Sequence, residues 1–298
     1  MSQLNNPLPY ILRTREWYQG LGYGEPYQWA HFEDVPFFKP RKPLSESVVG
    51  LVTTAALYRA DNGDQGPGAT YNAQAKFYSV YSKPIDPEPD VRISHIAYDR
   101  KHTSAEDKNT WFPLTALKEL EKKNVIGQVA NHFYGLPTNR SQRHTLENDC
   151  PALHRLVSGI DLAILVANCP VCHQSVSLAA RYLEEQGIPT VVMGCAKDIV
   201  ENVGVPRFLF SDFPLGNAAG KPFDLESQNQ TISLGIDLFE TATTPRTTLQ
   251  SPITWHSSHD WKKDYSNIAL LSEQEIATRR AEFDRQKSIA KQQRQNQS

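Results

Sequence analysis

The chain has 298 residues, of which 39% are hydrophobic and 21% are charged. This composition is typical of a globular protein and excludes a collagen, a coiled coil or a chain that is disordered throughout. The 31 lysines and arginines nearly balance the 33 aspartates and glutamates. We therefore expect no strongly basic surface that would bind nucleic acid or an acidic membrane.

The start of the chain lacks the basic and apolar regions of a signal peptide, and no apolar run approaches the ~20 residues of a membrane span. We predict a cytoplasmic protein with neither a membrane nor a nucleic acid as its partner. The four cysteines are too few for a disulfide framework at this length. In a reducing compartment, cysteines that lie close together in sequence favour catalysis or metal binding.

The pattern of residues divides the chain into three parts. Residues 1–45 are rich in aromatic residues and proline, and we expect an extension without regular secondary structure that packs on the main domain. Residues 46–243 form the expected α/β domain, which includes a turn-rich segment over 60–90 of the kind that forms a binding loop or lid. Residues 244–298 are polar, and we expect an extension that is partly helical or disordered.

Within the α/β domain, short apolar runs alternate with segments of helical periodicity. The expected strands are 48–53, 92–97, 125–130, 161–167, 190–193 and 208–210. The expected helices are 113–123, 146–158, 174–186 and 228–241. This order predicts an open, mostly parallel twisted sheet with helices on both faces.

Two cysteines, Cys169 and Cys172, stand between the central expected strand and the helix that follows it. Ligands bind beyond the carboxyl ends of strands in such sheets, and the amide groups at a helix start favour a thiolate. We therefore predict that Cys169 is the more acidic and nucleophilic thiol and that Cys172 resolves its adduct as a disulfide. His173 either supports the thiolate as an imidazolium or has no role.

The same pair could hold structural zinc, which usually needs a second pair of ligands at regular spacing. The remaining candidates, Cys150, His154 and Cys195, are single and scattered. We expect no metal and keep zinc as the alternative. Cys150 is expected to be buried and inert, whereas Cys195 is left open between an inert and a functional role.

Other polar residues follow expected strands at the same edge of the sheet. Arg100 suits a substrate carboxylate, and Asp99 could hold the guanidinium of Arg100 or an ammonium group. The alternative for both is a surface ion pair. Thr53 either donates a hydrogen bond to a ligand or caps its strand. Gly216 and Asn217 mark a close backbone approach to the site or a plain turn.

His132 ends the strand expected over 125–130. A histidine at that edge would be a suitable general acid for a leaving amine. The alternative is a histidine with no catalytic role.

Several segments share the pattern of one protein family, namely Ala163-Ile164-Leu165, Gly187-Ile188-Pro189, Tyr98-Asp99-Arg100, Phe112-Pro113-Leu114, Val125-Ile126-Gly127 and Phe213-Pro214-Leu215-Gly216-Asn217. Over roughly residues 44–224 the chain resembles the selenoprotein B components of glycine, sarcosine and betaine reductases and the related D-proline reductase. The selenocysteine of that family falls at Cys169 and its downstream cysteine at Cys172.

The resemblance implies a thiol-dependent reductase that cleaves a carbon–heteroatom bond of a small molecule, carbon–nitrogen in the characterised members. It further implies no bound cofactor and an external, thioredoxin-like dithiol reductant. Cysteine in place of selenocysteine is a weaker nucleophile. The resemblance leaves open whether a pyruvoyl-type partner subunit is required, whether the chain forms a homo-oligomer, and whether it is instead a non-catalytic electron-relay subunit.

Overall fold

The structure is a computed structural model that describes residues 5–66 and 68–297. Its main sheet has eight strands, with the order β10-β9-β8-β7-β1-β6-β3 and β5 paired beside β1. The strands are β1 (Val48–Thr53), β3 (Tyr81–Pro84), β5 (Gln128–Val129), β6 (His132–Gly135), β7 (Leu162–Val166), β8 (Thr190–Gly194), β9 (Arg207–Phe210) and β10 (Thr247–Gln250). All their pairings are parallel except that of β3 with β6. A separate antiparallel pair joins β2 (Ala56–Leu57) to β4 (Val91–Arg92).

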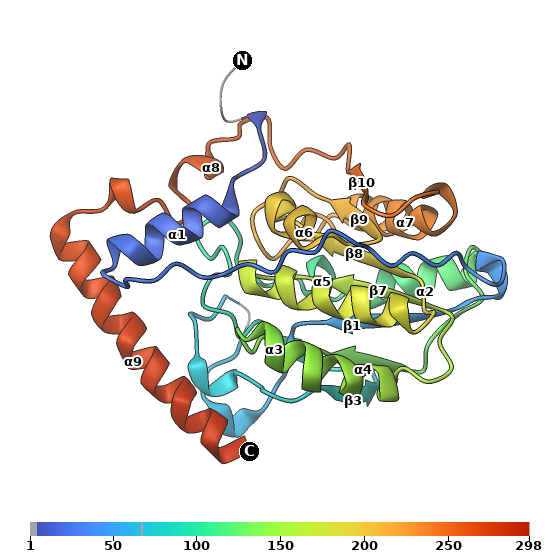
Figure 1. The fold of residues 1–298 in the computed structure, drawn as a ribbon, viewed down its shortest axis with the longest axis horizontal. Coiled ribbons are helices and arrows are strands. Elements are labelled where there is room, and N and C mark those ends of the chain that lie inside the picture. The colour runs from blue at the N-terminus through green and yellow to red at the C-terminus, as the bar shows by residue number, and fades with distance from the viewer. Residues whose placement is uncertain (1–4, 67, 298) are drawn as a thin grey trace.

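Helices cover both faces of the sheet, as predicted (Figure 1). Helices α2 (Leu114–Lys122) and α7 (Leu225–Thr241) pack on one face, and α4 (Cys150–Leu156), α5 (Pro170–Glu185) and α6 (Lys197–Val203) lie on the other. Strands β7 and β8 are buried along their whole length. Their residues alternate between two apolar cores, because successive side chains of a strand point to opposite faces.

The remaining helical elements are α1 (Tyr10–Gly20), α3 (Gln142–His144), α8 (Trp261–Asp264), α9 (Glu273–Gln297), the π-helical turn Thr145–Asp149 and the 3₁₀ turns Leu44–Glu46, Ala60–Asn62, Ala73–Ala75 (η4), Lys108–Thr110 and Ile268–Leu270. Within the part of the chain that the structure describes, no helix is both long and apolar enough to cross a membrane.

Two expected strands differ from those observed. The strand expected over 92–97 is wrong, because β4 ends at Arg92 and pairs with β2 outside the main sheet. The chain then turns, with the Arg100 amide donating to the carbonyl of Tyr98. The strand expected over 125–130 shortens to β5, and a second strand, β6, begins at His132.

The N-terminal segment contains a helix that the sequence did not predict. Helix α1 has no acidic residue in its first turn and no side-chain cap of its own. Its Ile11 amide instead donates to Asp198 of α6 at 2.8 Å, so the partner of this helix end is 187 residues away in sequence.

After α1 the chain crosses over α5 (Figure 1). The Ala30 amide donates to Gln174 at 2.7 Å and the Phe38 amide donates to Glu184 at 2.6 Å. Both acceptors belong to α5, so polar side chains of that helix hold this segment in place.

The C-terminal segment contributes both to the sheet and to its surroundings. Strand β10 extends the sheet beside β9. Helix α9 runs diagonally along one side of the molecule (Figure 1), where Tyr78 donates to the carbonyl of Ala290 at 2.7 Å and the Ala73 amide contacts Gln286 at 3.3 Å. These contacts place α9 against the loop that follows β2.

Candidate functional site

The strand order changes direction between β1 and β7. From β1 the chain proceeds to β6 on one side, and it then returns to β7 on the other side before continuing outward to β10. Ligands of open α/β sheets bind at such a switch point, outside the carboxyl ends of the strands. Thr54 and Asn168 follow these two strands, and the Asn168 amide donates to the Thr54 hydroxyl at 2.9 Å.

Cys169 and Cys172 lie directly beyond this switch point. Helix α5 begins at Pro170, four residues earlier than expected, and Cys169 is its N-cap. The Cys172 amide donates to the Sγ atom of Cys169 at 3.3 Å. The two Sγ atoms are 2.7 Å apart, and the exposed fractions of the residues are 5% for Cys169 and 0% for Cys172. The two sulfurs are therefore close enough to form a disulfide, and Cys169 is the more accessible thiol.

A buried histidine and threonine complete the environment of Cys172. The Thr138 hydroxyl lies 3.5 Å from the Sγ atom of Cys172, and the Nε2 atom of His95 lies 3.3 Å from the same hydroxyl. The ligand atoms of His95, Cys169 and Cys172 all lie within 4.8 Å of one another. These three residues are the group that could hold a metal ion.

We did not predict His95 or Thr138 as site residues. His95 falls within the strand expected over 92–97. It reaches Cys172 because β4 ends at Arg92 and the chain turns across the carboxyl edge of the sheet.

The two thiols have opposite pKa shifts. Burial raises the pKa of Cys169, and the hydrogen bond and negative charge of Cys172 raise it further. Burial also opposes ionisation of Cys172, but the Cys169 hydrogen bond and the charge and hydrogen bond of His95 lower its pKa well below the usual value. The prediction that Cys169 is the more acidic thiol is therefore wrong, because Cys172 loses its proton first.

Three cations lie around the thiols. Burial and the charge of Arg140 lower the pKa of Lys76 to about 8, while both thiols act in the opposite direction. Arg140 lowers the pKa of Cys169 in part, and Cys169 also acts on the pKa of Arg100. The site therefore favours negative charge on a thiol or on a bound molecule. Lys76 and Arg140 were not predicted, since no local motif marks them.

The segment that carries Lys76 contacts the loop of Thr138 on one side and helix α9 on the other. Lys76 follows the turn η4, and its Nζ atom lies 5.0 Å from the centroid of the Tyr78 ring. The carbonyl of Tyr78 accepts from Asn139 at 3.2 Å, next to Thr138. Helix α9 contacts the same segment, as described above, so this helix supports the site from outside.

His173 does not act as an imidazolium. It is fully buried, and burial lowers its pKa to about 4. Its Nδ1 atom donates to the carbonyl of Cys169 at 2.7 Å, and Nε2 accepts from the amide of Cys195 at 2.8 Å. The neutral ring thus ties the start of α5 to the end of β8.

The expected pairing of Asp99 with Arg100 is wrong. Asp99 accepts from the Nδ1 atom of His102 at 2.9 Å. Arg100 donates to the carbonyl of His95 at 2.7 Å and to that of Ala69 at 3.3 Å. Arg100 therefore holds the loop that carries His95, and Asp99 lies outside the cysteine site, in contact with the C-terminal segment through His102.

Thr53, Gly216 and Asn217 make structural contacts. Thr53 donates to the carbonyl of Trp111 at 3.2 Å and accepts from the Ala55 amide at 3.1 Å, which is strand capping. Gly216 has a φ of 108°, and a Cβ there would overlap the ring of Tyr98. Asn217 donates to the carbonyl of Pro214 at 2.9 Å within its own turn. These contacts match the structural alternatives stated for all three.

The structure places His132 away from the cysteines. It is exposed and begins β6, so it lies at the amino end of that strand. Tyr134 is level with Val52, which is level with Leu165. At about 3.3 Å per residue, His132 is about 20 Å below the level of Cys169. The general-acid assignment is therefore wrong, because the strand expected over 125–130 does not end at His132.

The other two cysteines lie outside the group formed with His95. Cys150 is fully buried in an apolar core, and burial raises the pKa of its thiol above the usual range. Burial raises the pKa of Cys195 to about 12, although the backbone amide of Asn217 opposes this shift. Both thiols are therefore protonated at neutral pH.

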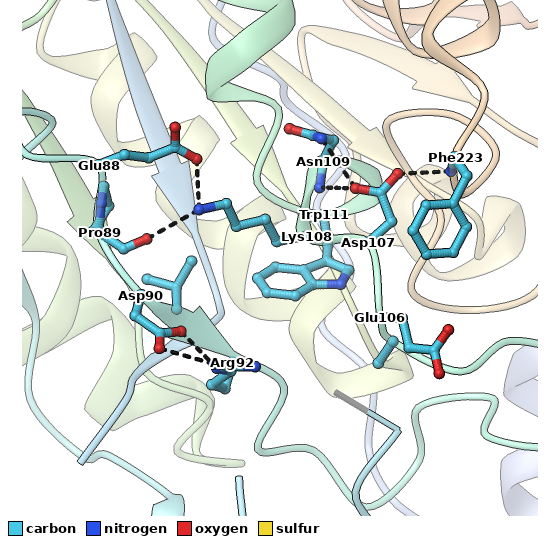
Figure 2. Close-up of a pocket in the computed structure, with 12 residues that line it drawn as sticks. Glu88, Pro89, Asp90, Arg92, Glu106, Asp107, Lys108, Asn109, Trp111 and Phe223 are labelled. Carbon is cyan, nitrogen blue, oxygen red and sulfur yellow. Dashed lines mark hydrogen bonds and ion pairs between the residues drawn. The ribbon is translucent and has the colours of Figure 1, made fainter. Parts of the chain in front are cut away.

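A cavity of about 510 Å³ lies elsewhere in the structure, and the cysteines are not among its lining residues. Figure 2 shows the side chains that line it. Lys108 pairs with Glu88 and Arg92 pairs with Asp90 at its wall, and Phe223 lies at its rim. Four of its charged side chains, Glu88, Lys108, Asp90 and Arg92, thus already pair with one another. We therefore place the candidate active site at the cysteines.

Comparison with known proteins agrees with the resemblance. The profile of the family described as "Glycine/sarcosine/betaine reductase selenoprotein B (GRDB)" matches residues 18–150, which include part of the aromatic N-terminal segment and end before the cysteine pair. D-proline reductase subunit gamma of Acetoanaerobium sticklandii is 30% identical over 192 residues, which are 63% of this chain and 76% of that subunit.

More distant relatives are longer proteins. Glycine reductase complex component B subunit gamma of Symbiobacterium thermophilum is 25% identical over 67% of this chain. Sarcosine reductase complex component B subunit beta of Peptoclostridium acidaminophilum is 23% identical over 65% of this chain. The chain spans 48% and 45% of these two relatives, and no solved structure gives a match. By its similarity to D-proline reductase subunit gamma and to the family profile, the chain belongs to the selenoprotein B family of glycine, sarcosine, betaine and D-proline reductases.

Proposed function

We propose that the chain is the thiol-bearing component of a reductase that cleaves a carbon–heteroatom bond, of the carbon–nitrogen type, in a small molecule. The observation that carries this proposal is the 2.7 Å separation of the Cys169 and Cys172 sulfurs at the switch point of the sheet. It is supported by relatives that are named as subunits of reductase complexes.

In the first step the shared proton passes to Cys172, and the thiolate of Cys169 attacks the carbon that bears the heteroatom. A carbon–sulfur bond forms and the carbon–heteroatom bond breaks. The leaving group keeps the electron pair and takes up a proton. Cys169 is assigned this role because it retains 5% exposure, whereas Cys172 is fully buried.

In the second step Cys172 gives up the proton that it accepted, which restores the proton supplied to the leaving group, and its thiolate attacks the sulfur of Cys169. A disulfide forms, the carbon–sulfur bond breaks, and the carbon takes the electron pair and a proton. The substrate is thereby reduced by two electrons and the cysteine pair is oxidised. His95 and Thr138 support this step, because they lie where they stabilise negative charge on Cys172.

Lys76 replaces His132 as the general acid in this proposal. Its ammonium lies in the electrostatic range of both thiols, and its pKa of about 8 keeps it protonated at neutral pH yet able to give up a proton. The charges of Arg140 and Arg100 would attract an anionic group of the substrate. Arg100 also donates to the carbonyls of His95 and Ala69.

An external thioredoxin-like dithiol would return the pair to its reduced state, so no bound cofactor is needed for the two steps. A pyruvoyl-type partner subunit would be required only for a substrate whose amine needs activation as a Schiff base. A substrate that is quaternary or otherwise activated would need no such partner. The alternative is an electron-relay subunit that does not itself bind the substrate. In that case the cysteine pair would be oxidised and reduced only while a partner subunit turns over its substrate.

The test is a screen of the isolated protein with D-proline, glycine, sarcosine and betaine, using dithiothreitol as reductant. We expect one of them, or a related amine, to be consumed in proportion to dithiol oxidised. Cys169→Ser should abolish consumption and Cys150→Ala should not. Consumption that survives Cys169→Ser would contradict the proposed chemistry. Turnover seen only with a partner subunit present, and without a substrate adduct on Cys169, would favour the relay role.

Structural zinc remains the second candidate, favoured by the grouping of His95, Cys169 and Cys172. Structural zinc sites almost always have four protein ligands, and the group found among the described residues has three. Metal analysis of the protein purified without added metal separates the two candidates. One zinc per chain that resists chelation and protects both thiols from alkylation would replace the redox proposal.

A further inference from the structure

We propose that His95, Cys169 and Cys172 form a reversible binding site for a thiophilic divalent cation, for which Zn²⁺ is the probe, and that the bound cation blocks the reductase. The binding itself depends only on the geometry of the three residues. The inhibition rests on the function proposed above.

The donor set suits a thiophilic cation. Two sulfurs and one imidazole nitrogen lie within 4.8 Å of one another, and all three residues are buried. Thiolate and imidazole ligands favour zinc over magnesium or calcium, which prefer oxygen. The cation displaces the protons of the two thiols on binding, and the resulting thiolates supply the negative charge that a divalent cation requires.

Thr138 and Arg100 hold the histidine in place. The Thr138 hydroxyl contacts both His95 Nε2 and the Sγ atom of Cys172. Arg100 donates to the carbonyl of His95 at 2.7 Å and holds its main chain. The Nδ1 atom of His95 is buried and has no hydrogen-bond partner among the described residues. The ring is thus held beside the thiols, with one of its nitrogens within 4.8 Å of both sulfurs.

The number of ligands indicates a reversible site. With three protein ligands, a tetrahedral cation keeps a fourth position for water or a small thiol, as in zinc sites that exchange ligands. The same two sulfurs cannot bind the cation once they are joined in a disulfide. Cation binding and oxidation of the pair therefore exclude each other, and the cation blocks the sulfur of Cys169 from attacking a substrate.

The test titrates the full-length protein with Co²⁺ and Zn²⁺ after reduction and removal of the reductant. We expect one cation per chain, a thiolate-to-cobalt charge-transfer band that Zn²⁺ displaces, and full release by a chelator. Protein oxidised to the disulfide should bind none. This comparison uses the wild-type chain and needs no variant to fold.

Variants locate the ligands. His95→Gln should weaken Zn²⁺ binding at least about tenfold, since the loss of even an outer-shell contact costs about 10–100-fold. Cys172→Ser should abolish the charge-transfer band, and Cys150→Ala should leave it unchanged. Equal binding by the oxidised protein, or unchanged affinity in His95→Gln, would overturn the site.

The two proposals fail separately. If the reduced protein binds Zn²⁺ as described but no substrate oxidises the pair, the site stands and the proposed function does not. If substrate turnover oxidises the pair but Zn²⁺ neither binds nor slows turnover, the reductase stands and the cation site is wrong. Zinc that cannot be removed without unfolding the protein would also overturn a reversible site.

Discussion

The Sγ atom of Cys172 lies 2.7 Å from that of Cys169 and 3.5 Å from the hydroxyl of Thr138. The first contact lets the pair share a proton, and the second joins the pair to His95. Cys172 has the lower pKa, so the negative charge of the pair lies on its sulfur. Cys169 is the more solvent-exposed of the two, so a substrate would reach its sulfur first. Attack on a substrate then requires only that the shared proton move from Cys169 to Cys172.

His95→Gln should raise the pKa at which the pair first ionises. The wild-type imidazole lowers the pKa of Cys172 through its charge and its hydrogen bond, and glutamine has no charge. Each unit of pKa changes the thiolate fraction about tenfold below the pKa. The rate of iodoacetamide reaction, followed against pH by mass spectrometry, measures this shift. The matched control is His154→Gln, which should leave the pH profile in place.

Lys76→Met should remove the alkaline fall of the reaction rate. With a pKa of about 8, the ammonium of Lys76 is present below that pH and lost above it. We therefore expect wild-type turnover to decline above about pH 8. The variant should be slower by about 10²- to 10⁴-fold if Lys76 is the general acid, with no such decline. The rate of turnover between pH 6 and 10 tests this. A variant that keeps both the rate and the decline would exclude Lys76 from proton transfer.

His173 should make the protein sensitive to acid. Its folded pKa, lowered by burial, is about 4, whereas the unfolded value is about 6.5. Its contribution is therefore complete above pH 6.5 and is lost as the pH falls towards 4, with a total of about 3 kcal/mol. Urea unfolding at several pH values measures the effect. His173→Gln should be less stable at neutral pH but should show a smaller loss between pH 6.5 and 4. An unchanged slope would mean that other groups cause the acid sensitivity.

The buried ion pair of Glu184 in α5 and Arg207 in β9, which the N-terminal segment covers, should be sensitive to substitution. Their side chains are 0% exposed with a 3.0 Å contact, and Arg207 also lies 4.2 Å from the ring centroid of Phe37. Glu184→Gln leaves an uncompensated buried charge and should cost about 3–5 kcal/mol of unfolding free energy. Glu184→Gln combined with Arg207→Met should cost less than the single change. The control is Glu282→Gln, which removes the exposed ion pair of Glu282 with Arg285. It should change the free energy of unfolding in urea very little.

The predicted parts of the fold are those whose contacts follow from local pattern. Strands β1 and β7 were correct because unbroken apolar runs between turns have few alternatives. Helix α1 was missed because its end is satisfied by Asp198, far away in sequence. A strand was expected over 92–97 because this run has the residue pattern of a strand. The expectation was wrong because the main chain turns after Arg92 and brings His95 towards Cys172.

The site was predictable only to the extent that it is local. Cys169 and Cys172 were found because strand, cysteine pair and helix follow one another in sequence. His95, Thr138 and Lys76 come from three different loops, and only the tertiary structure brings them to the pair. His132 was misplaced because one expected strand proved to be two, which moved its position to the opposite edge of the sheet.

The most direct test of the account is a single turnover of Cys172→Ser beside the wild-type protein. The wild type, freed of reductant and given a substrate found in the screen, should lose two thiols per product released. Cys172→Ser should release the leaving group once, keep the remaining carbon skeleton bound to Cys169, and form no disulfide. Mass spectrometry of the peptide that contains Cys169 would identify this adduct. Turnover that leaves all four cysteines of the wild type free, or a variant that completes repeated turnovers without an adduct, would contradict the central claim.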